Sequence, residues 1–176
     1  RIGITVVYVT HDQSEALTMS NRIAVFDEGV IQQLSTPDIL YEKPENSFVA
    51  QFIGENNRMT GTIKNIDEKY CEVDLDGGGI VKALKVNIGS VGERTQLSVR
   101  PERVSVNTQE ISNENNFKGD IKELIYLGDH IRARIEVCGN DEFIVKIPNE
   151  GSVALKEGAS INLHWQAEDI RALDPL

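Results

Sequence analysis

Thr10-His11-Asp12 is the segment of this 176-residue chain whose residue types and order are best suited to chemistry. It follows a run of β-forming residues at positions 5–9 and precedes a run of helix formers that starts at Ser14. An imidazole can donate or accept a hydrogen bond and can change its protonation near neutral pH. Open α/β sheets bind ligands at the carboxyl ends of their strands, where this order of elements puts His11. His11 is therefore the candidate catalytic residue, and the alternative is a turn histidine without a chemical role.

The elements around His11 indicate the end of an α/β domain. Residues 5–9 predict a fully buried strand of a parallel sheet. Asp12 or Thr10 is suited to cap a helix over residues 14–19, and Glu15 would complete a capping box with Asp12. The other elements expected in this part are a hairpin over 22–34, a helix that begins at Thr36-Pro37 and ends at Lys43, and a helix over 48–53.

The sequence pattern changes near residues 54–57. From Met59 onward, apolar and polar residues alternate with a period of two and the turns are rich in glycine, as at 77–79. The expected strands are 61–66, 70–75, 80–86, 95–100, 104–107, 119–126, 131–137, 143–147 and 159–165, with a loop or linker at 111–116. Short strands at regular spacing are typical of a small Greek-key barrel. The predicted fold class is thus mainly β: an OB-like Greek-key barrel module over 57–176, preceded by an α/β remnant over 1–56.

Two patterns recur within this β module. The stretch that starts Gly61-Thr62-Ile63-Lys64 recurs as Gly119-Asp120-Ile121-Lys122. The stretch 92–104 recurs as 158–170, with glycine, leucine, glutamate and a final β-branched residue in the same order. Either the recurrence is a coincidence in a strand-rich sequence, or the module contains two similar halves packed together.

Composition excludes some classes of function. The formal net charge is −10, which argues against a nucleic-acid backbone as partner, because such proteins need a basic face. Cys71 and Cys138 lack the spacing of a metal site and are expected to be buried, reduced thiols. His130 and His164 are expected to be structural, and Trp165 to lie in the core or an interface. The sequence lacks both a signal-peptide pattern and a membrane-spanning run of about 18 apolar residues, so membrane association would require a partner.

The residues around His11 resemble the switch, or H-loop, segment of ABC-transporter ATPases. The order is an apolar strand, Thr10-His11-Asp12 and then Gln13-Ser14-Glu15-Ala16, and the match continues to Phe52-Ile53-Gly54-Glu55-Asn56. The chain resembles the importer subfamily for polyamines, maltose-type sugars, sulfate or iron, in which an OB-type domain follows the ATPase domain. The segment 52–56 is most similar to the spermidine/putrescine type. Signatures of transport-associated OB (TOBE) domains stand at Arg100, Pro101 and Glu102, and at Tyr126, Leu127 and Gly128.

This resemblance implies that His11 contacts the γ-phosphate of ATP in the complete ATPase, where Mg²⁺ accompanies the nucleotide. The Walker A pattern and the Leu-Ser-Gly-Gly-Gln signature do not occur in this sequence. We therefore expect this chain alone to bind no cofactor or metal and to hydrolyse no ATP. Because it begins at Arg1 and not at Met, we also expect further residues before it.

The resemblance also implies partners and a location. The expected partners are transmembrane permease subunits and a second copy of the chain, held through a regulatory β domain. The expected location is cytoplasmic, peripheral on the inner face of the bacterial plasma membrane.

Two other functions fit an OB-like module. One is an independent sensor of small oxyanions, for which Gly89-Ser90 and Lys82 would supply a backbone nest and a cation. The other is a nucleic-acid-binding OB domain, which the negative charge disfavours.

Overall fold

The computed structural model describes residues 3–107, 114–149 and 155–175. Contacts divide the chain into two compact units, which we call unit 1 (1–54) and unit 2 (55–176). The boundary lies close to the position at which the sequence pattern changes. Within the described ranges, no helix is long and apolar enough to cross a membrane.

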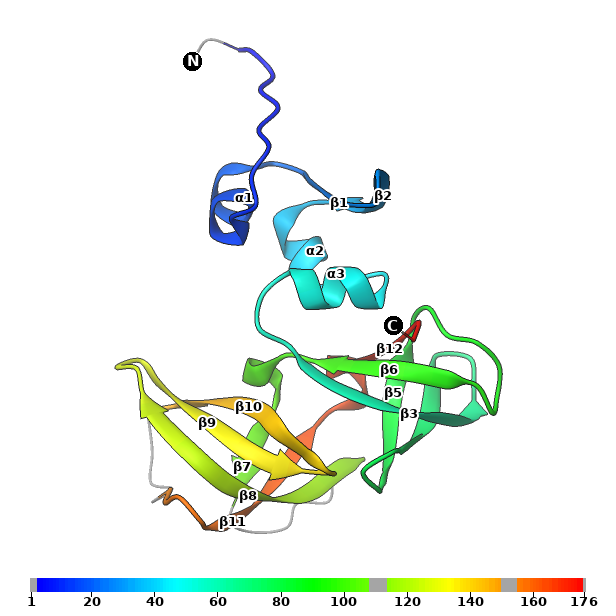
Figure 1. The fold of residues 1–176 in the computed structure, drawn as a ribbon, viewed down its shortest axis with the longest axis vertical. Coiled ribbons are helices and arrows are strands. Elements are labelled where there is room, and N and C mark those ends of the chain that lie inside the picture. The colour runs from blue at the N-terminus through cyan, green and yellow to red at the C-terminus, as the bar shows by residue number, and fades with distance from the viewer. Residues whose placement is uncertain (1–2, 108–113, 150–154, 176) are drawn as a thin grey trace. The chain divides into compact units, whose positions relative to one another are not determined.

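Unit 1 contains three short helices and one hairpin (Figure 1). In chain order these are α1 (Gln13–Met19), β1 (Ile23–Asp27), β2 (Val30–Ser35), α2 (Pro37–Glu42) and α3 (Ser47–Phe52). Glu28 and Gly29 connect the antiparallel strands β1 and β2 with φ angles of 46° and 80°, as a two-residue type I′ turn requires. The elements predicted after His11 are thus present. Buried apolar side chains from β1, α2 and α3 form their core: Ile23, Val25, Leu40, Val49 and Ile53.

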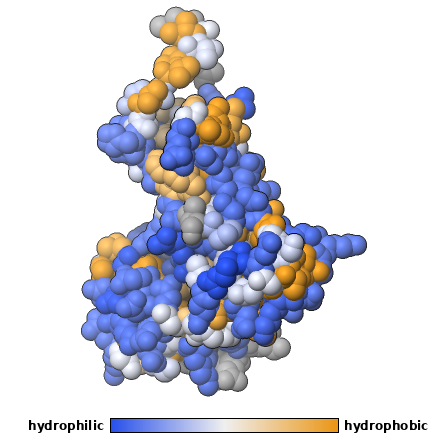
Figure 2. All heavy atoms as spheres, turned by 45° about the vertical axis from the view of Figure 1, so that its right-hand side comes forward, coloured by the Kyte–Doolittle hydropathy of each residue, from blue (hydrophilic) through white to orange (hydrophobic). Residues whose placement is uncertain are grey.

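The strand predicted over residues 5–9 is not formed. This segment pairs with no strand of the described chain, and its apolar side chains face solvent, with Val7 88% and Val9 90% exposed. Figure 2 shows apolar surface along this N-terminal segment of unit 1. A strand needs a neighbour to complete its backbone hydrogen bonds. The prediction of a buried parallel strand is therefore wrong for this chain.

One part of unit 2 is a closed five-stranded barrel, in which the strand order is β12-β5-β4-β3-β6. Its strands are β3 (Asn57–Ile66), β4 (Tyr70–Leu75), β5 (Ile80–Lys85), β6 (Arg94–Val99) and β12 (Ile170–Leu173). The last of these closes the barrel by pairing parallel with β5 and antiparallel with β6. The sequence pattern did not predict β12, which has only four residues.

The rest of unit 2 is a five-stranded sheet with the order β10-β9-β8-β11-β7 (Figure 1). Its strands are β7 (Ser105–Asn107), β8 (Asn115–Tyr126), β9 (His130–Val137), β10 (Asn140–Pro148) and β11 (Ser160–Trp165). Two single-turn 3-10 helices, η1 (Pro101–Arg103) and η2 (Ala167–Asp169), follow β6 and β11. One core of buried side chains joins barrel and sheet. The mainly β fold with an OB-like barrel is confirmed.

The two recurring sequence patterns occupy equivalent places in unit 2. A register shift follows Ile63 in β3 and Ile121 in β8. The Ile63 carbonyl accepts from the Gly92 N–H at 2.8 Å, and the Ile121 carbonyl accepts from the Gly158 N–H at the same distance. Each half ends in a 3-10 helix and then a strand that pairs with the other half: β7 pairs with β11, and β12 pairs with β6.

The prediction of a loop over 111–116 is wrong at the C-terminal end of that segment. Residues 111–113 lie outside the described residues, but Asn115 and Asn116 belong to β8. The Asn115 side chain explains the earlier start of the strand, because its Oδ1 accepts from the Lys82 N–H and its Nδ2 donates to the Lys82 carbonyl, both at 2.9 Å. A fully buried asparagine is tolerated here because its amide is paired.

Candidate functional site

His11 lies on the surface of unit 1, directly before α1. The Asp12 carboxylate caps this helix by accepting from the N–H groups of Ser14 and Glu15, at 2.8 and 3.2 Å. The Glu15 carboxylate accepts from the Thr10 hydroxyl at 2.8 Å, so the expected reciprocal bond to Asp12 is replaced by one to Thr10. His11 is exposed and its ring makes no hydrogen bond within the described chain. A fixed turn thus presents a free imidazole.

Two residues of the Arg-Pro-Glu signature, Arg100 and Pro101, are buried in unit 2, and Glu102 is exposed. Arg100 is 5% exposed, and its Nη1 donates to the Glu55 carbonyl at 3.1 Å. Pro101 is buried and starts η1, where its missing N–H costs nothing. The Glu102 carboxylate lies 3.9 Å from the Lys146 Nζ. The signature therefore anchors the first residue of unit 2.

The Glu55 carboxylate is held by two cations of the open sheet. It accepts from the Arg132 Nε and Nη2 at 2.9 and 2.7 Å, and Lys146 Nζ lies 3.4 Å away. Partial burial acts to raise the pKa of Glu55, but the hydrogen bond and attraction from Arg132, with the attraction of Lys146, outweigh it and lower the pKa. Glu55, Arg100, Arg132 and Lys146 thus form one charged cluster.

The Tyr-Leu-Gly signature forms the exposed tip between β8 and β9. Tyr126 is 72% exposed and Leu127 is 52% exposed. Gly128 has a φ angle of 94°, which favours glycine. Tyr126 pairs in register with Ile131, the neighbour of Arg132 in the charged cluster. The Tyr-Leu-Gly signature is therefore presented to solvent, whereas Arg100 and Pro101 of the other signature are buried in the fold.

The residues expected to form an oxyanion nest are occupied by carboxylates of the protein. The Ser90 N–H donates to the Glu93 carboxylate at 3.0 Å. The Lys82 Nζ lies 2.8 Å from the Glu114 carboxylate. Ser90 and Lys82 thus each contact a carboxylate of the protein, and the structure gives no support to the predicted oxyanion nest.

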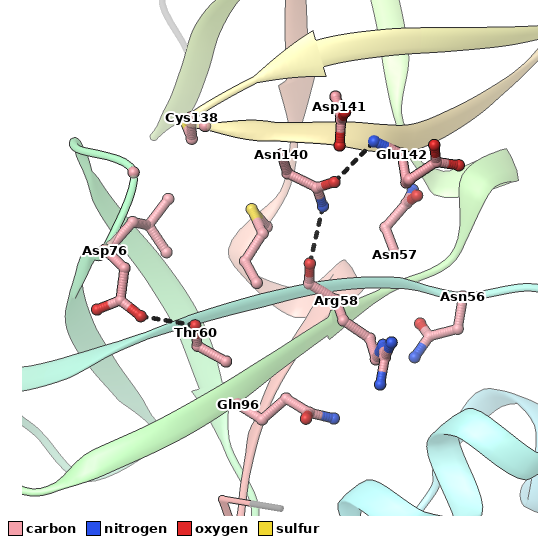
Figure 3. A pocket seen from close by; sticks show the side chains of 14 residues that line it. Asn56, Asn57, Arg58, Thr60, Asp76, Gln96, Cys138, Asn140, Asp141 and Glu142 are labelled. Atoms are coloured by element: carbon pink, nitrogen blue, oxygen red, sulfur yellow. Dashed lines mark hydrogen bonds between the residues drawn. The ribbon is translucent and has the colours of Figure 1, made fainter.

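A groove of about 840 Å³ lies where the β4–β5 and β9–β10 hairpin tips meet (Figure 3). The tips touch through backbone, since a Cβ atom added to Gly77 would lie 1.5 Å from the Cys138 carbonyl oxygen. The groove is lined from four separate segments, 56–60, 75–77, residue 96 and 138–142. This separation along the chain explains why sequence reasoning missed it.

Hydrogen bonds fix the polar walls of the groove. The Asn140 Nδ2 donates to the Arg58 carbonyl at 3.0 Å, and the Asn140 Oδ1 accepts from the Glu142 N–H at 2.9 Å. On the opposite wall, the Thr60 hydroxyl donates to Asp76 at 2.7 Å. Hydrogen bonds from the Arg94 guanidinium and from Thr60 hold the pKa of Asp76 well below its usual range. Asp76 therefore carries its negative charge at any physiological pH.

The cysteines and the tryptophan have structural environments. Cys71 is buried as expected, whereas Cys138 is only half-buried, in a turn where its φ angle is 49°. Burial raises the pKa of each thiol to about 11, so both stay protonated near neutral pH. Trp165 is 1% exposed and stacks on Phe117 and Phe143. It lies in the core, which is one of the two places expected for it.

Comparisons with known proteins agree with this architecture. Residues 97–173 match the TOBE domain family. The spermidine/putrescine import ATP-binding protein PotA of Pseudomonas aeruginosa UCBPP-PA14 is 41% identical over 151 residues, which are 84% of this chain and 41% of that protein. The protein of the same name from Trichodesmium erythraeum is 36% identical over 181 residues, 98% of this chain and 47% of that protein. The chain thus spans less than half the length of these relatives, and the second match extends over both units.

A solved structure has a related fold. The cytoplasmic molybdate-binding protein ModG, crystallised with molybdate bound, aligns with a TM-score of 0.58 over 68% of this chain and 96% of that chain. The two sequences are 20% identical. At this identity the likeness concerns the fold.

Proposed function

We propose, from the membership of this chain in the family of TOBE-containing ATP-binding subunits of ABC importers, that unit 1 completes an ATPase domain and unit 2 regulates it. The observation that carries the proposal is the similarity to import ATP-binding proteins across 98% of the chain. It covers both the segment around His11 and the β module.

His11 acts as the switch residue in this proposal. Its exposed imidazole, at the start of a capped helix, is suited to donate to a terminal phosphate oxygen of ATP. When bound, ATP with Mg²⁺ supplies the phosphoryl group and the charge that neutralises it. The phosphate-binding loop and the Mg²⁺ ligands would come from other parts of the complete protein, so the 176-residue chain alone turns over no ATP.

The proposed transport role is polyamine uptake, which is supported by the names of the relatives. The partners would be transmembrane permease subunits, and the location the cytoplasmic face of the plasma membrane. Unit 2 would also hold a homodimer, to which the exposed Tyr126 and Leu127 offer apolar surface. A light-scattering mass of one chain at high concentration would contradict the dimer.

The experiment compares ATP hydrolysis by the full-length protein and by its His11→Ala variant. We expect the variant to lose about 100-fold or more of the rate, as removal of a positioned hydrogen-bonding catalyst does. His164→Ala changes a half-buried histidine of β11 and should retain the rate. A His11→Ala protein as active as the parent, or ATP turnover by the 176-residue chain, would refute the proposal.

A further inference from the structure

We infer that Gln13 positions the candidate switch residue His11, and that it links His11 to unit 2 through Gly54 and Glu55. The inference rests on the switch role proposed for His11 and deepens it, because it names the contacts through which the β module acts on that residue. Gln13 is a positioning residue in this account. It acts on His11 through helix α1 and does not itself contact the nucleotide.

The turn that carries His11 is tied to α1 by local hydrogen bonds. The Asp12 N–H donates to the Thr10 hydroxyl at 2.9 Å, and that hydroxyl donates to the Glu15 carboxylate at 2.8 Å. The Asp12 carboxylate accepts in turn from two N–H groups in the first turn of α1. All of these bonds lie within residues 10–15. They fix His11 relative to α1 and leave the position of α1 itself to other contacts.

Helix α1 is held to the rest of unit 1 by few contacts. It has seven residues and none of them is buried, although Ala16 and Leu17 pack partly against the core of unit 1. A helix of this length is unstable in water on its own, so single tertiary contacts matter. The Gln13 Oε1 supplies one by accepting from the Gly54 N–H at 2.8 Å, across 41 positions of the chain. This hydrogen bond between half-buried groups ties the first residue of α1 to the end of unit 1.

Gly54 is a rigid partner for Gln13. Its φ angle is 70°, and an added Cβ would lie 2.6 Å from a ring carbon of Tyr41, so the position favours glycine. The residue before it, Ile53, still donates its N–H to the Val49 carbonyl of α3. The Gly54 N–H is directed to the Gln13 side chain instead. The bond therefore depends on the path that the backbone takes at residue 54.

The next residue, Glu55, is held by cations of unit 2. Its carboxylate accepts from Arg132 Nε and Nη2 at 2.9 and 2.7 Å. The Lys146 Nζ lies 3.4 Å from the same carboxylate. One planar peptide bond joins Glu55 to Gly54. A displacement of β9 or β10, which carry these two cations, is therefore transmitted along the backbone to the bond that Gln13 makes.

The first test measures the link itself, in the 176-residue chain and without nucleotide. Gln13→Met keeps the length of the side chain but removes the acceptor, whereas Gln13→Glu keeps an acceptor. We expect the Gly54 amide to exchange its hydrogen about fivefold faster in Gln13→Met than in the parent, as loss of one hydrogen bond implies. NMR measures this rate. Gln13→Glu should stay close to the parent, as should Thr18→Val, which alters a bond inside α1. Equal exchange in Gln13→Met and the parent would overturn the inference.

The second test is ATP hydrolysis by the full-length protein. Gln13→Met should lower kcat about tenfold and leave KM for ATP within about twofold, because a displaced His11 loses its contact in the transition state while most nucleotide contacts lie elsewhere. Gln13→Glu should restore kcat, which a general loss of structure would not allow. If Gln13→Met kept the kcat of the parent while His11→Ala lost hydrolysis, the link would be rejected and the proposed function would stand. The exchange of Gly54 needs no nucleotide, so failure of the link and failure of the switch role give different results.

A double-mutant cycle tests the extension to unit 2. Glu55→Ala removes the carboxylate from its two cations and should lower kcat about threefold, in line with a partly exposed charge pair. The double variant Gln13→Met/Glu55→Ala should have the kcat of Gln13→Met alone, since both changes break the same link. Glu123→Ala removes a comparable partner from Arg134 of the same sheet and should leave kcat unchanged. An unchanged kcat in Glu55→Ala, or multiplied effects in the double variant, would overturn the link to unit 2.

Discussion

At the scale of single residues, Gly77 shows how closely the two hairpin tips of unit 2 approach. Its φ angle is not positive, so its backbone conformation is open to other residues. The constraint is space, because the Cys138 carbonyl lies where a Cβ would be. The neighbouring Gly78 is constrained by its backbone and not by space: its φ angle is 91°, and an added Cβ would meet no atom within 4 Å.

Gly77→Ala should therefore destabilise unit 2 by about 3 kcal/mol, because backbone must move to accommodate the methyl group. Gly78→Ala should cost about 1 kcal/mol, the strain of a left-handed alanine. Urea denaturation of the two variants measures both values. A larger loss in Gly78→Ala than in Gly77→Ala would show that the tips do not meet as described.

The signature residues show how far the contacts of a single residue can be predicted from the sequence. A resemblance marked Arg100 as significant, but its partner is a backbone carbonyl 45 positions earlier, at Glu55. Such a contact follows from the way the chain folds back and leaves no local pattern. Asp12 was predicted well because its cap involves the next three residues alone.

At the scale of elements, two asparagines tie the halves of unit 2 together. Asn57 joins the start of β3 to Ile144 in β10, and Asn115 joins the start of β8 to Lys82 in β5. Each amide acts as a short piece of strand, donating to one backbone carbonyl and accepting from one backbone N–H. Both side chains are buried, at 3% and 0% exposure.

Asn57→Asp and Asn115→Asp should each cost about 2–3 kcal/mol, because a carboxylate oxygen replaces the donor and faces a buried carbonyl. The equivalence of the halves makes the two losses similar. Asn65→Asp, at an exposed position, should stay within about 0.5 kcal/mol of the parent. Chemical denaturation would reject this role if either buried variant were as stable as the Asn65 control.

Strands with clear alternation were predictable, and those that depend on distant partners were not. The pattern located β4 at 70–75 because its alternate residues face core and solvent. It missed β12, whose four residues are stabilised by pairing with β5 and β6. It also predicted a strand at 5–9. The residues there are β-forming types, but no described segment lies beside them as a neighbouring strand.

At the scale of the whole chain, the two halves of unit 2 share a strand order but differ in their surfaces. One is closed by Phe117 and the other keeps an open groove. Sequence predicted the repeat, but only the fold shows which half is open, because its walls come from segments far apart.

The central claim is that this chain belongs to the ATP-binding subunit of a polyamine importer. The most direct test is uptake of labelled 1,4-diaminobutane by cells that carry the full-length protein, compared with cells that carry His11→Ala at equal abundance. Uptake should be lost in the variant and retained in the His164→Ala control. Equal uptake with the parent and with His11→Ala would contradict the account.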